Sequence, residues 1–385
     1  MGYRRENGTV GVRNYVAIIP SVFCANTTVQ RIAEKVEGAV ALRHPLGCAQ
    51  VGYDLELTVR TLVAMGSHPN VAAVLVVGLG CERCKPEEVY EGIKRTGKPV
   101  EMLVVQDDGG MTETIKKGIE IAGEMAEAAK KLQRVEVPIS ELMIGTKCGG
   151  TDATSGLAAN PVVGNMCDRL IAEGGSAILS ELNELLGTED ILARRAATPE
   201  VGEKIKAAVY EIEEELKNRC DLRYPERNNL ISPGNFAGGV SSVVEKALGG
   251  VHKSGTSKFV DVLDYALPSE DGKKGLFLMK YESHDGEVVT GMIGCGAQIV
   301  AFTTGRGNPT GFPFVPVVKV TGNKFTYEKM KESFDFDASP IISDGVAIEE
   351  LGEELLTEII EIASGKETTA ELFGADDLFC IARRF

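Results

Sequence analysis

Apolar runs alternate with helical patterns along the first third of the chain. The runs are rich in Val, Ile, Leu and Ala, and the segments between them have the spacing of amphipathic helices. Such alternation predicts parallel strands joined by helices, as in a doubly wound α/β sheet. The predicted strands are 15–20, 40–45, 71–80 and 100–106, with helices after residue 26, at 54–65, from Pro86 and up to about residue 131.

A second α/β region follows the connector at 136–141 and runs to the end of the chain. We therefore predict two α/β domains with mostly parallel, doubly wound sheets, at residues 1–137 and 138–385. Ligands of such sheets bind beyond the carboxyl ends of the strands, so an active-site cleft is expected there. The predicted elements are a strand from residue 142, strands at 259–266, 298–305 and 314–322, and helices at 189–219 and 346–364.

Five short segments between the apolar runs concentrate Gly with Cys, Asn, Asp and Arg. Glycine lets the backbone approach a ligand closely and adopt positive φ. Each segment alone is explained by a tight turn, but five of them at the ends of predicted strands indicate one shared site. They are HPLGCAQ (44–50), GTKCGGTDATSGLAANP (145–161), SPGNFAGG (232–239), GCGAQ (294–298) and TTGRGNPTG (303–311).

Three of the nine cysteines, Cys48, Cys148 and Cys295, stand beside glycine in these segments. Three separate thiolates can bind iron, either as one Fe²⁺ ion or as an iron–sulfur cluster with an open position. The alternative is that each is a small buried apolar side chain. Cys81 and Cys84 form a lone CxxC pair, which suits half a metal site, a redox pair or a coincidence of spacing.

Two histidines, His44 and His252, also fall in Gly-rich segments and are candidates for proton transfer. Lys253 follows His252 and could act as a base or bind a carboxylate. Arg306 has the planar fork that binds carboxylates through two hydrogen bonds. GRGNPTG lacks the lysine and hydroxyl pair of a phosphate loop, and VGLGCERC does not match GxGxxG, so nucleotide sites are not expected.

The net charge of −15 argues against nucleic acids and anionic membranes as partners, because both require basic surfaces. An anionic substrate would need local positive charge inside this acidic protein. No apolar run is long enough for a membrane-spanning helix, and the N-terminus does not read as a signal peptide. These features, with scattered cysteines, predict a cytoplasmic protein.

The same segments together resemble the altronate/galactarate dehydratase family, which also includes sulfolactate sulfo-lyase. The resemblance begins at YRRENGTVGVRN (3–14) and includes HPNVAAVLVVGLGCE (68–82), SPGNFAGGVSSVVEKALGG (232–250), TGRGNPTGFPFVPVVKV (304–320) and FDFDAS (334–339). Two further segments, HPLGCAQVGYD and CGGTDATSGLAANPVVG, match the family at His44, Gly47, Cys48, Gln50, Cys148, Asp152, Ser155 and Asn160.

The resemblance implies a lyase that acts on a hydroxylated carboxylic acid with iron, or alternatively Mn²⁺ or Mg²⁺. In that reading a metal and a base assist removal of the α-proton, and the β-substituent then leaves. His44 or His252 moves the proton, while Lys253 and Arg306 neutralise substrate charge. The substrate hydroxyls are oriented by Asp152, Ser155, Asn160, Asn235 and Gln298.

Three functions remain open at this point. The first is a hydro-lyase that converts a sugar acid such as altronate or galactarate to a 2-keto-3-deoxy acid. The second is the large subunit of a (2R)-3-sulfolactate sulfo-lyase, which would expel sulfite from the same enediolate. The third is a non-catalytic subunit that binds a small acid.

The resemblance also implies a partner. Long-chain relatives carry an additional small β-rich module, whereas split relatives have it on a separate polypeptide. We expect such a small β-rich subunit to bind this chain, together with assembly of the chain into a homo-oligomer.

Overall fold

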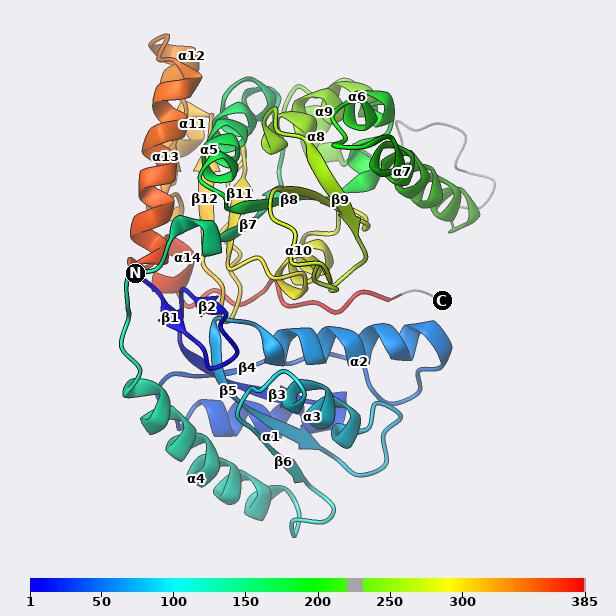
Figure 1. The fold of residues 1–385 in the computed structure, drawn as a ribbon, viewed down its shortest axis with the longest axis vertical. Coiled ribbons are helices and arrows are strands. Elements are labelled where there is room, and N and C mark those ends of the chain that lie inside the picture. The colour runs from blue at the N-terminus through cyan, green and yellow to red at the C-terminus, as the bar shows by residue number, and fades with distance from the viewer. Residues whose placement is uncertain (220–230, 384–385) are drawn as a thin grey trace.

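The computed structural model describes residues 1–219 and 231–383, in which the chain forms two parallel sheets (Figure 1). The smaller sheet has the order β4-β3-β5-β6, and all of its pairs are parallel. Its strands are β3 (Tyr15–Pro20), β4 (Ala39–Ala41), β5 (Val71–Gly78) and β6 (Val100–Val104). The helices between them are α1 (Asn26–Ala33), α2 (Gly52–Ser67), α3 (Pro86–Lys94) and α4 (Met111–Lys130).

The larger sheet has seven parallel strands in the order β13-β12-β11-β7-β8-β10-β9. Its strands are β7 (Met143–Cys148), β8 (Ser176–Leu179), β9 (Phe259–Leu263), β10 (Leu276–Met279), β11 (Ile299–Thr303), β12 (Val317–Thr321) and β13 (Phe336–Asp337). Its helices are α5 (Asn160–Ala172), α6 (Glu189–Arg194), α7 (Pro199–Arg219), α8 (Pro233–Ala237), α9 (Val243–Val251), α10 (Asp285–Gly294), α11 (Lys324–Lys329), α12 (Pro340–Ser343), α13 (Ile348–Ala363) and α14 (Thr369–Leu372).

One apolar cluster, at the centre of the molecule, contains side chains from both sheets. In β11, Ile299 and Ala301 pack with the α5, α7 and α13 side chains, whereas Val300 and Phe302 pack toward the smaller sheet. In β3, Ala17 and Ile19 pack in the same central cluster as Val300 and Phe302 of β11. Val16 and Ile18 point to the other face of β3, where they pack against α1 and α4. The period-two alternation of buried strands thus produces layered cores, and the central one joins the two α/β regions.

Polar contacts fix the junction between the regions. A two-stranded antiparallel ribbon, β1 (Tyr3–Arg4) and β2 (Val10–Gly11), precedes Arg13, whose guanidinium pairs with Glu371 at 2.6 Å. Asn70 donates from its side-chain amide to the carbonyls of Gln298 and Phe314. The C-terminal segment then runs between the two sheets (Figure 1), where Phe379 lies 6.5 Å from the His44 ring.

The prediction of an α/β fold with mostly parallel, doubly wound sheets is confirmed. The predicted long helix at 189–219 is two helices, α6 and α7, separated by a turn. The strands that were not predicted are all short, and they include β8 and β10 of the larger sheet. Within the described residues, no helix combines the length and the hydrophobicity that crossing a membrane would require.

Candidate active site

The candidate active site lies where the strand order of the larger sheet reverses. Strand β7 lies between β11 and β8, and its carboxyl end is Cys148, opposite Thr303 of β11. Such a reversal opens a crevice beyond the strand ends in parallel α/β sheets. A cavity of about 260 Å³ occupies this region, and its lining includes Cys148, Thr151, Asp152, Asn160, Lys246 and His252.

A buried cluster of charged side chains lies under this cavity. The Lys147 ammonium pairs with Glu181 and, at 2.8 Å, with Asp285. The Lys253 ammonium pairs with the other oxygen of Glu181 and lies 3.0 Å from the Cys148 sulfur. Lys147, Lys253 and Glu181 are all almost completely buried, so each charge depends on its partners for stabilisation.

The partners keep the two lysines charged. Burial alone would lower the pKa of Lys147, but the carboxylates of Glu181 and Asp285 raise it well above its usual value. Burial also opposes the charge on Lys253, whereas Cys148 and Glu181 raise its pKa. Burial and Glu181 raise the pKa of the Cys148 thiol, and the positive charges of Lys253 and Lys147 oppose this rise. Lys253 is therefore a fixed cation, and it is not a base in this arrangement.

A second ion pair extends the cluster toward solvent. Lys246 of α9 bonds Glu184 and Asn235, each at 2.9 Å. Although burial opposes it, Lys246 lowers the pKa of Glu184 to about 2, followed by contributions from Lys147 and Lys253. Because Lys246 is only partly buried and lines the cavity, it is placed to meet an anionic ligand.

Local backbone geometry brings these residues together. Glu181 follows β8 with φ at 71°, an uncommon conformation for a residue other than glycine, and such strain often occurs at functional sites. His252 and Lys253 form a short turn packed on α5. A side-chain carbon at Gly164 of α5 would lie 1.9 Å from the His252 carbonyl oxygen, so only glycine permits this contact.

Asp152 and Ser155 organise the loop after β7. The Asp152 carboxylate accepts hydrogen bonds from the Ser155 backbone at 3.0 Å and from the Asn323 amide at 2.7 Å. This loop leads into one π-helical turn, Ser155–Ala159, and such turns are frequent at functional sites. The Asn160 amide bonds the Gly249 carbonyl and the Thr303 hydroxyl. These side chains hold the cavity wall in position, and their oxygens are already engaged.

The Asn235 side chain also supports the wall of this cavity. Its amide donates to the Thr151 carbonyl at 3.0 Å, and its oxygen accepts from Lys246. Arg306 is exposed and lines a neighbouring cavity, which shares Asp152 with the first. Eight predicted site residues thus gather in one region of the larger sheet: Cys148, Asp152, Ser155, Asn160, Asn235, His252, Lys253 and Arg306.

The other four lie elsewhere. The His44 ring is buried, with Nε2 2.7 Å from the Pro20 carbonyl oxygen and Nδ1 accepting from the Leu46 backbone at 3.2 Å. Burial lowers its pKa to about 4, although the Pro20 bond opposes this change. Both ring nitrogens are therefore engaged in hydrogen bonds. The His44 ring stabilises its own loop, although a role in proton transfer had been expected.

Cys295 and Gln298 lie at the amino end of the larger sheet. Both precede β11, and the five residue steps from Gln298 to Thr303, the partner of Cys148, span roughly 16 Å along the strand. The Cys295 thiol contacts the Asp264 carbonyl in the central core, and burial raises its pKa to about 12. Cys295 and Cys148 therefore do not meet, because helix α10 carries Cys295 back across the sheet.

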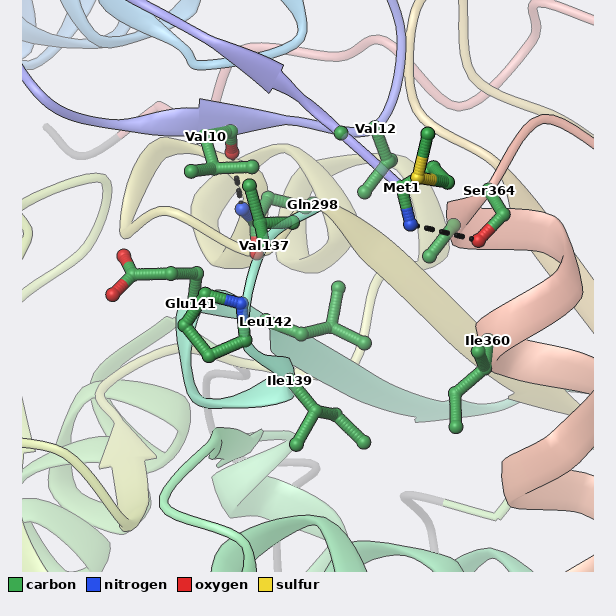
Figure 2. A pocket seen from close by; sticks show the side chains of 13 residues that line it. Met1, Val10, Val12, Val137, Ile139, Glu141, Leu142, Gln298, Ile360 and Ser364 are labelled. Carbon is green, nitrogen blue, oxygen red and sulfur yellow. Dashed lines mark hydrogen bonds between the residues drawn. The ribbon is translucent and has the colours of Figure 1, made fainter. Parts of the chain in front are cut away.

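Gln298 has a structural role at the junction. Its side chain bonds the backbone of Met143 at 2.7 Å and that of Val10 at 2.5 Å. Figure 2 shows it on the wall of a largely apolar cavity, close to Val10, Val137 and Leu142. Its hydrogen bonds connect the N-terminal ribbon to the start of β7. It does not line the cavity of the candidate active site.

Cys48 belongs to the smaller sheet, in the loop after β4, and its side chain is exposed. The two thiols of the CxxC pair, in the loop after β5, differ in burial. Cys81 is exposed, whereas Cys84 packs in the central core, where burial raises its pKa to about 12. Neither thiol forms a disulfide in this structure, and the inward position of Cys84 argues against a redox pair.

The candidate active site does not suit a metal ion in this arrangement. Cys148, Glu181 and Glu184 offer ligand atoms that all lie within 4.8 Å of one another. The carboxylates, however, already pair with Lys147, Lys253 and Lys246, and the thiol lies beside Lys253. A divalent ion would have to displace buried ammonium groups, so no step of the reaction is assigned to a metal here.

Both halves of the chain match models of known protein families. Residues 139–384 match the model described as D-galactarate/altronate dehydratase, C-terminal. Residues 2–130 match the model described as D-galactarate dehydratase/altronate hydrolase, second domain. The chain belongs to the D-galactarate/altronate dehydratase family. The predicted family is thereby confirmed, and the match covers the gathered site residues.

Relatives with different names are similarly close. Altronate dehydratase of Bacillus subtilis is 38% identical over 376 residues, 95% of this chain and 74% of the relative. The (2R)-sulfolactate sulfo-lyase subunit beta of Chromohalobacter salexigens is 37% identical over 377 residues, 97% of this chain and 95% of the relative. Galactarate dehydratase (L-threo-forming) of Escherichia coli is 33% identical over 388 residues, 96% of this chain and 73% of the relative.

Several site residues escaped the sequence interpretation. They carry charge but stand outside the Gly-rich segments or beside more conspicuous neighbours. A buried lysine and glutamate within apolar strand ends is the signal that could have found Lys147 and Glu181. The residues missed are Lys147, Glu181, Glu184, Lys246 and Asp285.

Proposed function

We propose that the chain is a hydro-lyase that removes water from a hydroxylated carboxylic acid of the sugar-acid class, giving a 2-keto-3-deoxy acid. The observation that supports it most is the cavity of the candidate active site. Its wall joins an exposed histidine, His252, to the partly exposed ammonium of Lys246, in a protein of net charge −15. Such local positive charge suits a carboxylate substrate.

In this reaction His252 accepts the α-proton, because imidazole exchanges protons near neutral pH. The electron pair of the broken C–H bond moves onto the substrate carboxylate as an enediolate. Lys246, with the fixed charge of Lys253 behind it, stabilises that negative charge. The enediolate then expels the β-hydroxyl, which takes the proton held by His252 and leaves as water. The resulting enol gains a proton at C3 from solvent and loses its hydroxyl proton, which gives the keto acid.

A second candidate reaction is supported by a specific comparison. The identity to the sulfolactate sulfo-lyase subunit is 37%, nearly the same as the 38% to altronate dehydratase. Elimination of sulfite passes through the same type of enediolate and needs the same base and cations. The two reactions therefore differ in the substrate that the cavity accepts, and Arg306 beside Asp152 is placed to influence that choice.

We further propose that the chain works with a second polypeptide. The sulfolactate relative is named as a subunit beta, which makes it one component of an assembly. A small subunit that covers the cavity would exclude water from the enediolate. Assembly into a homo-oligomer and a cytoplasmic location stay predictions.

The experiment is a substrate panel with altronate, galactarate and sulfolactate, read out as keto acid or sulfite. We expect keto acid from a sugar acid. His252→Gln should lower turnover by about 100-fold or more, the usual effect of losing a general base. Lys116→Met, which replaces an exposed lysine of α4, is the control and should retain activity. Keto acid formation that is unchanged in His252→Gln would contradict the assigned base.

A further inference from the structure

Three exposed cysteines gather at the carboxyl edge of the smaller sheet, away from the candidate active site. Cys24 follows β3, Cys48 follows β4 and Cys81 follows β5, and these three strands are adjacent and parallel. Carboxyl ends of adjacent parallel strands lie on one edge, so the three thiols come from neighbouring loops. The chain passes from β4 across β3 to β5, which makes this the reversal point of the smaller sheet.

Hydrogen bonds hold these three loops against one another. The Phe23 amide donates to the Leu46 carbonyl at 2.8 Å, and the amides of Arg83 and Cys84 donate to the Gly47 carbonyl at 3.1 and 3.0 Å. Cys24 and Cys48 are thus each one residue from a loop contact, and Cys81 is two residues from one.

Glu82 joins the third loop to the end of β3. Its carboxylate accepts from the Ser21 hydroxyl at 2.7 Å and from the backbone of Leu79 and Gly80. Gly47 has φ at 101°, and a side-chain carbon there would lie 2.2 Å from the Ser21 carbonyl oxygen. The loops are therefore closely packed, and the three thiols project from a fixed frame.

We infer that Cys24, Cys48 and Cys81 bind an iron–sulfur cluster. None of the three forms a disulfide, and all are exposed, whereas Cys84 in the same loop packs in the core. Three protein thiolates leave one iron of a four-iron cluster without a cysteine ligand. Exposed Arg43, Arg83 and Lys85 flank the thiols and suit the negative charge of a thiolate-bound cluster.

A single zinc ion fits less well. Zn–S bonds of about 2.3 Å require ligand sulfurs about 3.8 Å apart. Within residues 1–219 and 231–383, the groups of three donors within 4.8 Å are Cys148 with two glutamates and His284 with Glu287 and Cys380. The three exposed thiols form no such group, so a single zinc ion would require them to move closer together. Phe23 precedes Cys24, and Val51 and Tyr53 follow Cys48 by three and five residues; all three are exposed apolar side chains.

The test uses the full chain, purified without oxygen and reconstituted with ferrous iron and sulfide. We expect about four irons and four sulfides per chain, with visible absorption of a cluster. Cys24→Ser, Cys48→Ser and Cys81→Ser should each lose both elements. Cys148→Ser, which alters the candidate active site, should retain them, so the result does not depend on the proposed reaction.

A second measurement needs no variants. Alkylation mapped by mass spectrometry should find the three thiols protected in reconstituted protein and modified after chelation of iron. Iron without sulfide, zinc in place of iron, loss of the cluster in Cys148→Ser, or equal alkylation before and after chelation would each overturn the inference.

Discussion

At the scale of single residues, Glu181 is the group on which the candidate active site depends. Its two oxygens pair with Lys147 and Lys253, and all three side chains are buried. Removing one member of such a network leaves an uncompensated charge in a medium that solvates it poorly. The network therefore fixes the charge state of the site as well as its shape.

Lys253→Met should lower the free energy of unfolding by about 3–5 kcal/mol and abolish turnover. Glu181→Gln should have a similar cost, because two lysines then lose their partner. The double variant should lose less than the sum of the two single losses, since neither change then leaves the other group unpaired. Denaturant unfolding of the four proteins measures this coupling, and strictly additive losses would contradict the network.

Lys319 gives the protein a dependence on pH. Its ammonium is buried without a hydrogen-bond partner, 3.9 Å from the centre of the Phe302 ring. Burial lowers its pKa to about 7, although Asp335 and Asp285 oppose this and Lys147 adds to it. The unfolded chain therefore holds more protons than the folded chain between pH 7 and about 10.4, so stability rises with pH across that window.

In Lys319→Met this rise should be smaller, and the variant should be more stable than the parent at pH 6.5 by about 1–3 kcal/mol. Urea unfolding at pH 6.5 and pH 9 measures both effects. Lys98, whose pKa burial also lowers to about 7, keeps part of the pH dependence in the variant. An identical pH slope in both proteins would show that Lys319 stays charged.

The positions of several site residues could be predicted from the sequence, and those of others could not. The Gly-rich loop after a predicted strand indicated Asp152, because ligands of parallel sheets bind there. His252 and Lys253 were indicated by their Gly-rich surroundings, and they lie in the turn that follows α9. The same pattern was misleading for Cys295, since a loop before a strand and a loop after it look alike in sequence. Only the path of α10 shows that Cys295 lies at the amino edge.

At the scale of elements, packing of α5 against the turn that carries His252 and Lys253 positions the proposed base beside a buried cation. Gly164 makes this contact possible, because any side chain there would collide with the His252 carbonyl oxygen. In contrast, a side-chain carbon at Gly123 of α4 would meet nothing within 4 Å. Gly164 and Gly123 are therefore a matched pair for mutation, because both are in helices but only Gly164 lacks room for a side chain.

Gly164→Ala should separate α5 from the turn, lower stability by about 1–3 kcal/mol and reduce turnover. Gly123→Ala should raise stability by about 0.5–1 kcal/mol, because alanine favours the helix, and should leave turnover unchanged. Thermal unfolding and steady-state assays of both variants provide the comparison. Normal turnover and stability in Gly164→Ala would contradict the positioning role of this contact.

The helices and strands predicted from the sequence agree best with the structure where the apolar pattern is long. Strand β3 has the bounds predicted from its apolar run, and α13 lies within the predicted helix at 346–364. Strands β8 and β10 have four residues each, and a four-residue apolar run does not distinguish a strand from part of a buried helix. They form because they pair with each other, although about a hundred residues separate them, and because β7 and β9 supply the outer hydrogen-bonding partners.

At the scale of the whole molecule, the two regions share a core and should behave as one unit. Ile178, Phe277 and Phe302 of the larger sheet pack in the same cluster as Leu57 and Leu62 of α2. An interface that is large and apolar does not permit independent domains. The predicted division near residue 138 is thus a boundary in sequence, and the apolar contacts continue across it.

The intact chain should therefore unfold in a single cooperative transition, and residues 138–385 expressed alone should aggregate, because the central core would be exposed to water. Scanning calorimetry of the chain and solubility of the fragment test this. Two separated transitions, or a soluble and folded fragment, would show that the shared core contributes little.

The crevice at the end of β7 is proposed to perform an elimination on a hydroxylated acid. The most direct measurement follows the sugar acids and sulfolactate by nuclear magnetic resonance in deuterated water, with the parent chain and His252→Gln, each assayed with and without the proposed small subunit. We expect a 2-keto-3-deoxy acid from a sugar acid with the parent, and a loss of about 100-fold or more in turnover with the variant. Undiminished elimination by His252→Gln, or no elimination from any of the three acids by the parent, would contradict this proposal.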